Sequence, residues 1–183
     1  MPQTDKNAQF QAKLLRPRLP AGEPSWAFVV LPREVSEQLP RRGRTSVDGH
    51  LNGQPFRARL EPDGQLSHWL RVDSDLLQAA GASVGDLVTL EIEPVTEEPE
   101  PQVPADLAAA LAAAPAARSV WDATTTIARL DWIHWIESAK QAKTRAKRIA
   151  DACAMLGEGK QRVCCFDQSG YYSKALRAPE AAD

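Results

Sequence analysis

The sequence is poor in cysteine, aromatic residues and long apolar runs. Its 183 residues include three cysteines and 6% aromatic residues. Three is an odd number and two of them are adjacent, which excludes the paired framework of a small disulfide-stabilised secreted domain. No run of about 18 apolar residues occurs, so no membrane-spanning helix is expected. The first twenty residues also lack the apolar core of a signal peptide, and we therefore expect a cytoplasmic protein.

Neither sign of charge dominates the chain. It has 22 basic and 24 acidic residues and a formal net charge of −2, so a polyanion-binding signature of the whole chain is absent. The charges are unevenly distributed, because residues 96–106 carry four acids and no base, whereas residues 107–183 carry 11 bases and 8 acids. An acidic segment therefore precedes a basic C-terminal part.

Spaced metal ligands and cofactor motifs are also missing. The chain has no CxxC or HxxxH pair, and its three histidines, His50, His68 and His134, are scattered. A P-loop, a dinucleotide fingerprint, HExxH and GxSxG are all absent. We expect no metal and no cofactor, and the pattern assigns no catalytic residue.

A proline-rich acidic segment marks a boundary between two halves. Residues 93–104 contain four prolines and four acids, which favour extended, solvated backbone over a packed strand or helix. The predicted organisation is a β-rich domain over residues 9–93, followed by a linker over 94–103. A helical domain over 104–161 and a polar tail over 168–183 complete it.

The N-terminal half reads as short strands with turn residues between them. Alternating or continuous apolar runs predict strands over 10–14, 26–31, 66–72 and 87–93. Asn52-Gly53 between two alternating runs predicts a hairpin with a type I′ turn. Short helices are expected over 33–39, after Pro32, and over 73–81, as a capped helix ended by Gly81. This pattern indicates a small mixed barrel or sandwich.

The C-terminal half reads as helices. Alanine-rich residues from Pro104 to Ala114 are followed by Pro115, and a second helix is expected over 116–123. One of the threonines 124–126 should cap a third, largely buried helix that carries Trp132 and Trp135. A fourth helix is expected over about 143–156 and should end at Gly157 or Gly159.

Both halves resemble known bacterial sequences. The stretch Leu130-Asp131-Trp132-Ile133-His134-Trp135, with the basic residues that follow it to Ile149, is similar to the helical domain of the YdeI/OmpD-associated (bacteriocin-protection) family over about residues 104–161. The segments 26–32, 47–56 and 80–88 resemble an uncharacterised domain that commonly precedes it. That resemblance implies an α+β protein, with a double-split β-barrel related to the AbrB and MraZ group followed by a small all-α domain.

A basic cluster is the first candidate site. Five cations occur in nine residues without an acid between them, and Lys140, Lys143, Thr144, Arg145 and Arg148 are the candidate contacts for an anion or partner. Lys140, Lys143 and Lys147 should share one helix face. The alternative is a solvated helix face with one arginine packed on a tryptophan. Arg145 is expected to be structural, and Arg148 to pair with Asp131 or Glu137.

Other residues carry weaker hypotheses. Trp132 and Trp135 can form a stacking platform or belong to the core, with His134 expected on the polar side of the helix. Cys164 or Cys165 could be a reactive thiol near Lys160 and Arg162, or one cysteine could face inward and the other outward.

Polar residues also lie on the predicted strands. Asp48, His50 and His68 are among them. Arg57 and Arg59 should share a strand face and pair with Glu61, Asp63, Glu91 or Glu93.

Three functions remain open from the sequence. The leading interpretation is a non-enzymatic binding protein for an unknown protein or anionic ligand, in a stress or bacteriocin-protection response as the family name implies. The second is a nucleic-acid binder that uses the basic helix Lys140–Arg148, with homo-oligomers possible. The third is an enzyme acting on a small anionic substrate in an interdomain cleft, with His50 or His68 as its base.

Overall fold

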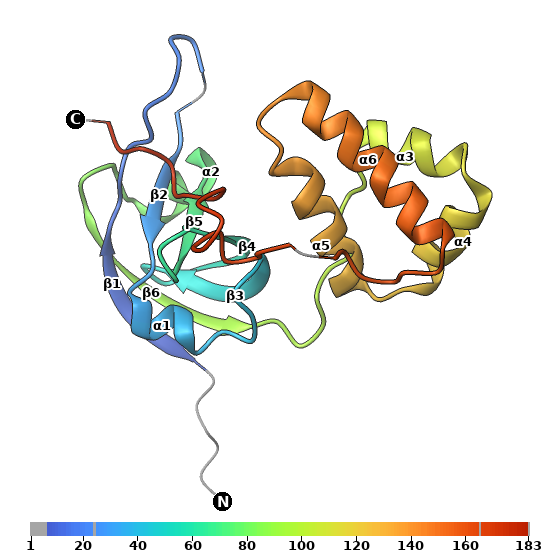
Figure 1. Ribbon diagram of the computed structural model, residues 1–183. Helices are drawn as coiled ribbons and strands as arrows, with labels where there is room; N and C mark the ends of the chain where they lie inside the picture. The colour runs from blue at the N-terminus through green and yellow to red at the C-terminus, as the bar shows by residue number, and fades with distance from the viewer. Residues whose placement is uncertain (1–6, 24, 165, 183) are drawn as a thin grey trace, which may run out of the picture. The chain divides into compact units, whose positions relative to one another are not determined.

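The computed structural model describes residues 7–23, 25–164 and 166–182. The chain divides into two compact units. Residues 1–97 and 169–183 form the first, which we call the barrel unit, and residues 98–168 form the second, the helical unit. Each unit has its own hydrophobic core, and both are drawn in Figure 1.

The barrel unit is a nearly closed six-stranded antiparallel barrel. Its strands are β1 (Ala8–Lys13), β2 (Ala27–Val30), β3 (Thr45–Leu51), β4 (Gln54–Pro62), β5 (His68–Val72) and β6 (Leu87–Pro94). They are hydrogen-bonded in the order β1-β6-β3-β4-β5-β2. Leu15, just after β1, exchanges two backbone hydrogen bonds of 2.9 Å with Phe28 of β2. These bonds bring the two edge strands together, and the N-terminal half is thus a barrel rather than a sandwich.

Alternating side chains fill the barrel, as the strand pattern predicted. Every strand contributes inward residues to one core, among them Phe10, Val29, Val47, Leu60, Leu70 and Leu90. The predicted hairpin joins β3 to β4, with φ of 48° at Asn52 and 84° at Gly53, as a type I′ turn requires.

Two short helices complete the barrel unit, α1 (Arg33–Glu37) and α2 (Ser74–Ala80). Gly81 ends α2 with φ of 63°, as predicted. The expected side-chain cap of α2 is wrong, however. Asp73 occupies the N-cap position without making a cap hydrogen bond, and its carboxylate accepts one from Arg71 at 2.8 Å. A cation two residues away competes with the helix for this carboxylate.

The C-terminal segment, expected as a polar tail, packs against the barrel. Ala181 forms a bridge with Pro17, and Arg18 binds Glu180 through both backbone and side chain, at 2.8 Å each. The backbone of Leu176 lies against Gly64, and its side chain lies against Gly170. Glycine is needed at both contacts, because a Cβ would collide with Leu176 and both residues have positive φ.

The packing at Gly64 gives a stability prediction. Gly64→Ala places a methyl group at positive φ and against the carbonyl oxygen of Leu176, so we expect a loss of about 2–3 kcal/mol. Gly85→Ala is the matched control, because Gly85 also has positive φ but open space around it, and it should lose only about 1 kcal/mol. Thermal unfolding and proteolysis of residues 169–183 measure both effects. Equal losses in the two variants would contradict the packing argument.

The helical unit contains α3 (Ala105–Ala112), α4 (Pro115–Ala123), α5 (Thr126–Glu137) and α6 (Ala142–Gly157). Pro115 breaks the alanine-rich run and starts α4 as its first residue. Of the three threonines predicted as possible caps, Thr125 caps α5, and its hydroxyl accepts a hydrogen bond from the Ala128 amide at 3.1 Å. Gly159 follows the end of α6 with φ of 93°.

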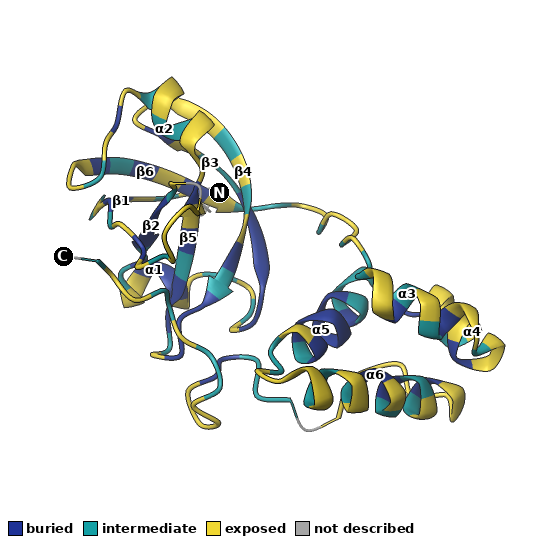
Figure 2. Ribbon diagram, turned by 90° about the horizontal axis from the view of Figure 1, so that it is seen from above, coloured by how far each residue is buried: buried dark blue, intermediate teal, exposed yellow. Residues whose placement is uncertain are grey.

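Helix α5 is the centre of the helical unit. In Figure 2 most of it is coloured as buried or intermediate, whereas α3, α4 and α6 each show one exposed face. Trp132 is fully buried, and its indole donates a hydrogen bond to the Gln161 carbonyl at 3.2 Å. The prediction that His134 lies on a polar face is wrong, because the residue is 2% exposed and its ring lies edge-on to Phe166. Gln161, Phe166 and Gln168 contact the side of α5 that the sequence pattern left open.

Candidate functional site

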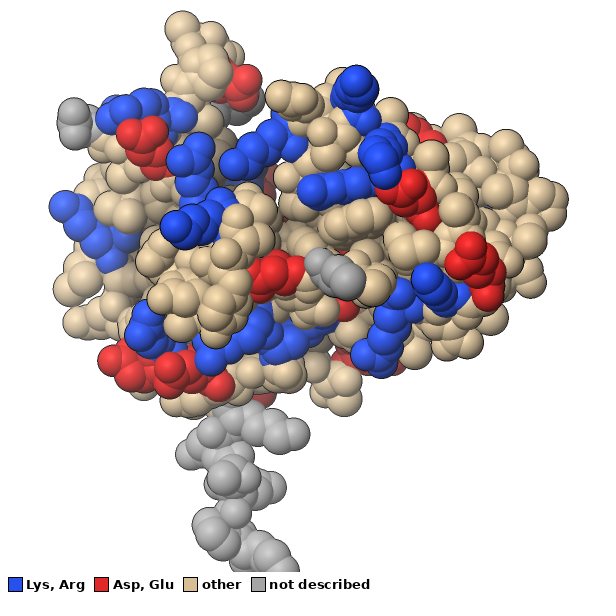
Figure 3. Space-filling model, in the orientation of Figure 1, with Lys and Arg blue, Asp and Glu red and all other residues tan. Residues whose placement is uncertain are grey.

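The predicted basic cluster does not lie on one helix face. Lys140 precedes α6, while Lys143 and Thr144 lie in its first turn. The expectation that Lys140, Lys143 and Lys147 line up on one helix is therefore wrong for Lys140. Lys147 pairs along the helix with Asp151 at 2.7 Å. Figure 3 shows basic side chains over α6 with acidic ones among them.

Arg145 has a structural role, as the sequence predicted. Its guanidinium donates two hydrogen bonds to Asp106, at 2.7 Å and 3.1 Å, and so ties the start of α6 to the start of α3. The hydrogen bond from Arg145 lowers the pKa of Asp106 below its ordinary value. A bidentate pair of this kind fixes both side chains, so the two donors that bind Asp106 are not available to bind a partner.

Arg148 also acts within the helical unit, but with partners that the sequence did not predict. Its guanidinium donates to the Trp135 carbonyl at 2.6 Å and to the Ser138 hydroxyl at 2.8 Å. It also lies over the Trp135 ring, 5.4 Å from the centroid. Arg148 therefore satisfies the carboxyl end of α5, where a cation is favourable, in place of the expected pairing with Asp131 or Glu137.

The amino end of α6 remains the most accessible part of the cluster. Its N-cap residue, Gln141, makes no side-chain cap hydrogen bond, so the first amides of the helix are not capped by that side chain. Lys140 precedes Gln141 and Lys143 follows it, and both lysines are exposed. In the part of the chain that the structure describes, neither lysine makes a hydrogen bond or ion pair. Thr144 is half-buried in the same turn.

The two tryptophans of α5 belong mainly to the core. Trp132 is fully buried and Trp135 is half-buried, and their rings meet edge to face with centroids 6.2 Å apart. Trp135 is further covered by Arg148. A stacking platform needs exposed ring faces, and Trp132 has none.

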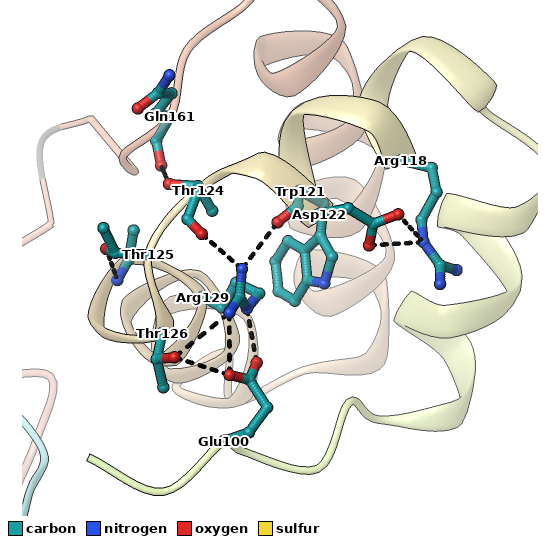
Figure 4. A network of polar contacts seen from close by, with 10 residues as sticks. Glu100, Arg118, Trp121, Asp122, Thr124, Thr125, Thr126, Arg129 and Gln161 are labelled. Carbon is teal, nitrogen blue, oxygen red and sulfur yellow. Dashed lines mark hydrogen bonds and ion pairs between the residues drawn. The ribbon is translucent and has the colours of Figure 1, made fainter. Parts of the chain in front are cut away.

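A network that the sequence did not predict fixes the end of the acidic linker (Figure 4). Arg129 of α5 donates to both carboxylate oxygens of Glu100, at 2.6 Å and 2.9 Å. The same guanidinium donates to the carbonyls of Trp121 and Thr124, at 3.1 Å and 2.6 Å. Hydrogen bonds from Arg129 and Thr126 lower the pKa of Glu100. This network holds the segment before α3 on the loop between α4 and α5.

A second candidate site lies on the barrel unit. A cavity of about 430 Å³ is formed over neighbouring segments of β3, β4 and β6. Its lining residues are Asn7, Asp48, Gly49, His50, Pro55, Phe56, Arg57, Glu91, Ile92 and Glu93. Cavities of this volume are large enough for a small-molecule ligand.

Strand register explains which residues meet at this cavity. Asp48 is directly opposite Glu93 on one side and Arg57 on the other, and His50 is directly opposite Glu91 and Pro55. Residues opposite each other in antiparallel strands share a sheet face, so these form two adjacent rows. The sequence showed the alternation along each strand, but the register that combines the strands required the fold.

The arginines of β4 are paired, though only in part as predicted. Arg59 pairs with Glu61 at 3.6 Å, which confirms that partner. Arg57 instead binds Asp48 through two hydrogen bonds of 2.6 Å and 3.0 Å. The hydrogen bond from Arg57 lowers the pKa of Asp48. Asp48 is the residue of β3 directly opposite Arg57, and this closeness prevails over the more distant acids of β6.

An aromatic cluster on β2 and β5 was also missed. The rings of Trp26 and Trp69 are nearly parallel with centroids 6.3 Å apart, and Phe28 meets Trp69 edge to face. The Arg71 guanidinium lies 4.4 Å from the Trp26 ring centre. Both tryptophans are half-buried and Phe28 is buried, so the cluster covers the outer face of these strands.

The two histidines proposed as bases occupy different environments. His50 is exposed and lines the barrel cavity. His68 is 1% exposed and both of its ring nitrogens are engaged, Nδ1 with the Ser36 hydroxyl at 2.7 Å and Nε2 with the Gly43 carbonyl at 2.9 Å. Burial lowers the pKa of His68. His68 is therefore a structural residue of the barrel core and cannot reach a substrate in a cleft.

The structure describes two of the three cysteines, Cys153 and Cys164. Cys164 is exposed, and Cys165 lies outside the described residues. Cys153 is half-buried against the core of the helical unit, where burial raises the pKa of its thiol. A raised pKa disfavours the thiolate, so Cys153 is a packing residue.

The described residues contain no cluster of three histidine, cysteine or acidic side chains placed to bind a metal ion. No helix among them is long and apolar enough to cross a membrane.

The fold and its surfaces define a two-unit α+β protein, an antiparallel barrel followed by a helical unit. Residues 100–159 match the family described as Bacteriocin-protection, YdeI or OmpD-Associated, and this match supports the resemblance seen in the sequence. Residues 10–92 match the family described as Domain of unknown function (DUF1905). No curated protein gives a significant match. The relation of the barrel to the AbrB and MraZ group stays a prediction.

Proposed function

We propose that the chain is a non-enzymatic binding protein that contacts an acidic partner protein through the start of α6. The observation that carries the proposal is the exposed, uncapped amino end of α6 with Lys140 and Lys143 beside it. The family description of residues 100–159 supports a role in bacteriocin protection. A cytoplasmic location and self-association stay predictions.

The physical chemistry of this helix end favours anions. The first amides of a helix have no partner within it, and the helix dipole places partial positive charge there. Two lysines add full charges at the same end, and helix amino ends commonly bind carboxylates and phosphates. Arg145 and Arg148, also predicted as contacts, would act here by holding α6 in place, because both are committed to partners inside the helical unit.

The other two hypotheses have less support. A nucleic-acid contact draws on the same surface, but the internal commitment of Arg145 and Arg148 leaves fewer cations to neutralise phosphates. The hypothesis of an enzyme with a base in a cleft cannot use His68, because that ring is buried and both of its nitrogens are hydrogen-bonded.

A charge-reversal experiment tests the proposal on the full chain. The double variant Lys140→Glu, Lys143→Glu should bind a polyglutamate peptide at least about tenfold more weakly than the wild type, which corresponds to ~1.4 kcal/mol. The matched control is Lys13→Glu, Lys160→Glu, which changes the net charge equally at two exposed lysines elsewhere and should bind normally. Circular dichroism checks that both variants fold.

Two outcomes would overturn this assignment. Equal peptide affinity in the wild type and the Lys140/Lys143 variant would exclude the α6 surface. Stronger binding of a single-stranded oligonucleotide than of the peptide, lost steeply with added salt and in the same variant, would favour the nucleic-acid function.

A further inference from the structure

We propose that the turn between β4 and β5 gathers three arginines into a binding site for a dianionic phosphate group, either free phosphate or a small monoester. The arginines are Arg33, Arg42 and Arg177, which come from three separate parts of the chain. All three belong to the barrel unit, so the site uses no residue of the α6 surface and either proposal can hold without the other.

The turn, residues 63–67, is fixed by its own hydrogen bonds. The Asp63 carboxylate accepts hydrogen bonds from the amides of Gln65 and Ser67, at 2.7 Å and 2.9 Å. Leu66 is held at φ of 65°, a conformation that is uncommon for a residue with a side chain. A turn fixed in this way presents its backbone carbonyls at defined positions.

Two successive carbonyls of the turn each bind an arginine. The Arg33 guanidinium donates to the Gln65 carbonyl at 3.2 Å, and the Arg42 guanidinium donates to the Leu66 carbonyl at 3.1 Å. Because successive Cα atoms lie about 3.8 Å apart, these bonds hold the two donor nitrogens within roughly 10 Å of each other. Neither arginine therefore has to be ordered from a freely moving state when a ligand binds.

The C-terminal segment brings a third arginine to the same turn. The Cα of Arg177 lies 3.5 Å from the position that a Cβ on Gly64 would occupy. Arg177 is exposed, and in the part of the chain that the structure describes it makes no hydrogen bond or ion pair. Three cations that are distant in the sequence therefore surround one turn.

No acid among the described residues forms an ion pair with these arginines. Arg33 and Arg42 are exposed, and each uses one of its five guanidinium N–H donors to bind the turn. Asp63, the acid of the turn, is 6% exposed and its carboxylate is occupied by the turn amides. Most of the guanidinium donors are thus available to an anion from solution.

The arrangement of the donors favours phosphate over other anions. A guanidinium matches the oxygens of carboxylate and phosphate alike, but a carboxylate presents two oxygens in one plane, whereas a phosphate group presents three in different directions. Bonds of about 2.8 Å to two oxygens of one phosphate bring their donors within roughly 8 Å, which agrees with the limit set by the turn. A nucleic-acid strand would instead need cations spread along its backbone.

The test is an NMR titration of the full chain at pH 8 and constant ionic strength, which follows the amides of residues 64–67 and the arginine Nε groups. We expect saturable shifts with inorganic phosphate and with methyl phosphate, which carry two charges at this pH. Dimethyl phosphate carries one charge and should bind at least about tenfold more weakly. Of the two dianions, the one that binds more tightly identifies the ligand as free phosphate or as an ester.

Variants assign the binding to the arginines. Arg33→Gln, Arg42→Gln should weaken phosphate binding at the turn by at least about tenfold. Arg16→Gln, Arg71→Gln removes the same charge from two exposed arginines away from the turn and should bind as the wild type does. Arg177→Gln should weaken binding by at least about threefold, and it tests the site without breaking any hydrogen bond to the turn.

The outcomes separate this inference from its competitors. Absence of saturable shifts at the turn with either dianion at millimolar concentrations would overturn it, as would unchanged affinity in the Arg33/Arg42 variant. An oligonucleotide without a terminal phosphate that binds the turn more tightly than methyl phosphate would overturn it in favour of a nucleic-acid contact. Lys140→Glu, Lys143→Glu should leave the shifts at the turn unchanged, so failure of the α6 proposal is read independently.

Discussion

Trp132→Ala should unfold much of the helical unit while the barrel unit stays folded. Trp132 is fully buried among the core residues of four helices, and its indole bonds to the Gln161 carbonyl. Removing a buried tryptophan leaves a large cavity and typically costs about 3–5 kcal/mol. A small unit has only a few kcal/mol of stability in total, so this loss is a large part of it. Hydrogen exchange of residues 98–168, compared with the barrel amides, measures the effect.

Two further variants separate the causes of that loss. Trp132→Phe keeps most of the apolar volume and removes the indole donor to Gln161, so it should cost about 1–2 kcal/mol. Trp135 lies three residues further along the same helix at a half-buried position, so Trp135→Ala should lower the free energy of unfolding less than Trp132→Ala does. If Trp135→Ala is as damaging as Trp132→Ala, Trp135 carries core packing that its exposure does not indicate.

Features set by neighbouring residues were predictable from the sequence. The type I′ hairpin at Asn52-Gly53, the break at Pro115 and the Thr125 cap each depend on interactions within a few residues. Local sterics and hydrogen bonding decide such positions, so the residue types identified the hairpin and the break and limited the cap to three neighbouring threonines.

Features set by distant contacts were not predictable. Arg145 binds Asp106, which is 39 residues away in the sequence, and Arg148 donates a hydrogen bond to the carboxyl end of α5 rather than to an acid. The His134 ring lies edge-on to Phe166, which is 32 residues further along the chain, and the helix pattern gave no sign of that contact. A helix pattern shows which residues share a face, but it cannot show what covers that face.

The cavity residues illustrate the same division. Alternation along a strand is enough to place Asp48 with His50 on one face of β3, and Glu91 with Glu93 on one face of β6. Which strand lies beside which depends on the barrel order, because β6 pairs with both β1 and β3 across long stretches of sequence. The expected partners of Arg57 were Glu61, Asp63, Glu91 or Glu93, whereas in the structure Arg57 binds Asp48, the residue directly opposite it.

Acidification should destabilise the barrel unit through His68. Burial lowers the pKa of His68, which favours the neutral ring, and in that form Nε2 donates to the Gly43 carbonyl and Nδ1 accepts from the Ser36 hydroxyl. The hydrogen bond to the Gly43 carbonyl and the charge of Asp63 raise this pKa, and Arg42 and Arg41 lower it, each less strongly than burial does. In the unfolded chain a histidine titrates near pH 6.5. Below that pH the unfolded state binds a proton that the folded state resists.

The sign of the effect follows from this difference in protons bound. The contribution of His68 is fully present above about pH 6.5 and is lost as the pH falls from there toward the lowered folded pKa, by up to about 1.4 kcal/mol per pH unit. The acids with lowered pKa, Asp48, Glu100 and Asp106, act in a separate window, because their stabilisation is lost only as the pH falls below about 4.

Urea unfolding of the barrel unit, followed by exchange of β5 amides between pH 8 and pH 5, measures the His68 contribution. His68→Gln should be less stable than the wild type at pH 8, because it loses the packed ring and part of its hydrogen bonding. Its stability should then change much less between pH 7 and pH 5. His50→Gln, at an exposed position, should keep the wild-type dependence on pH. If His68→Gln retains the wild-type slope, another group must be responsible for acid sensitivity in this range, and the neutral buried ring would have no role in it.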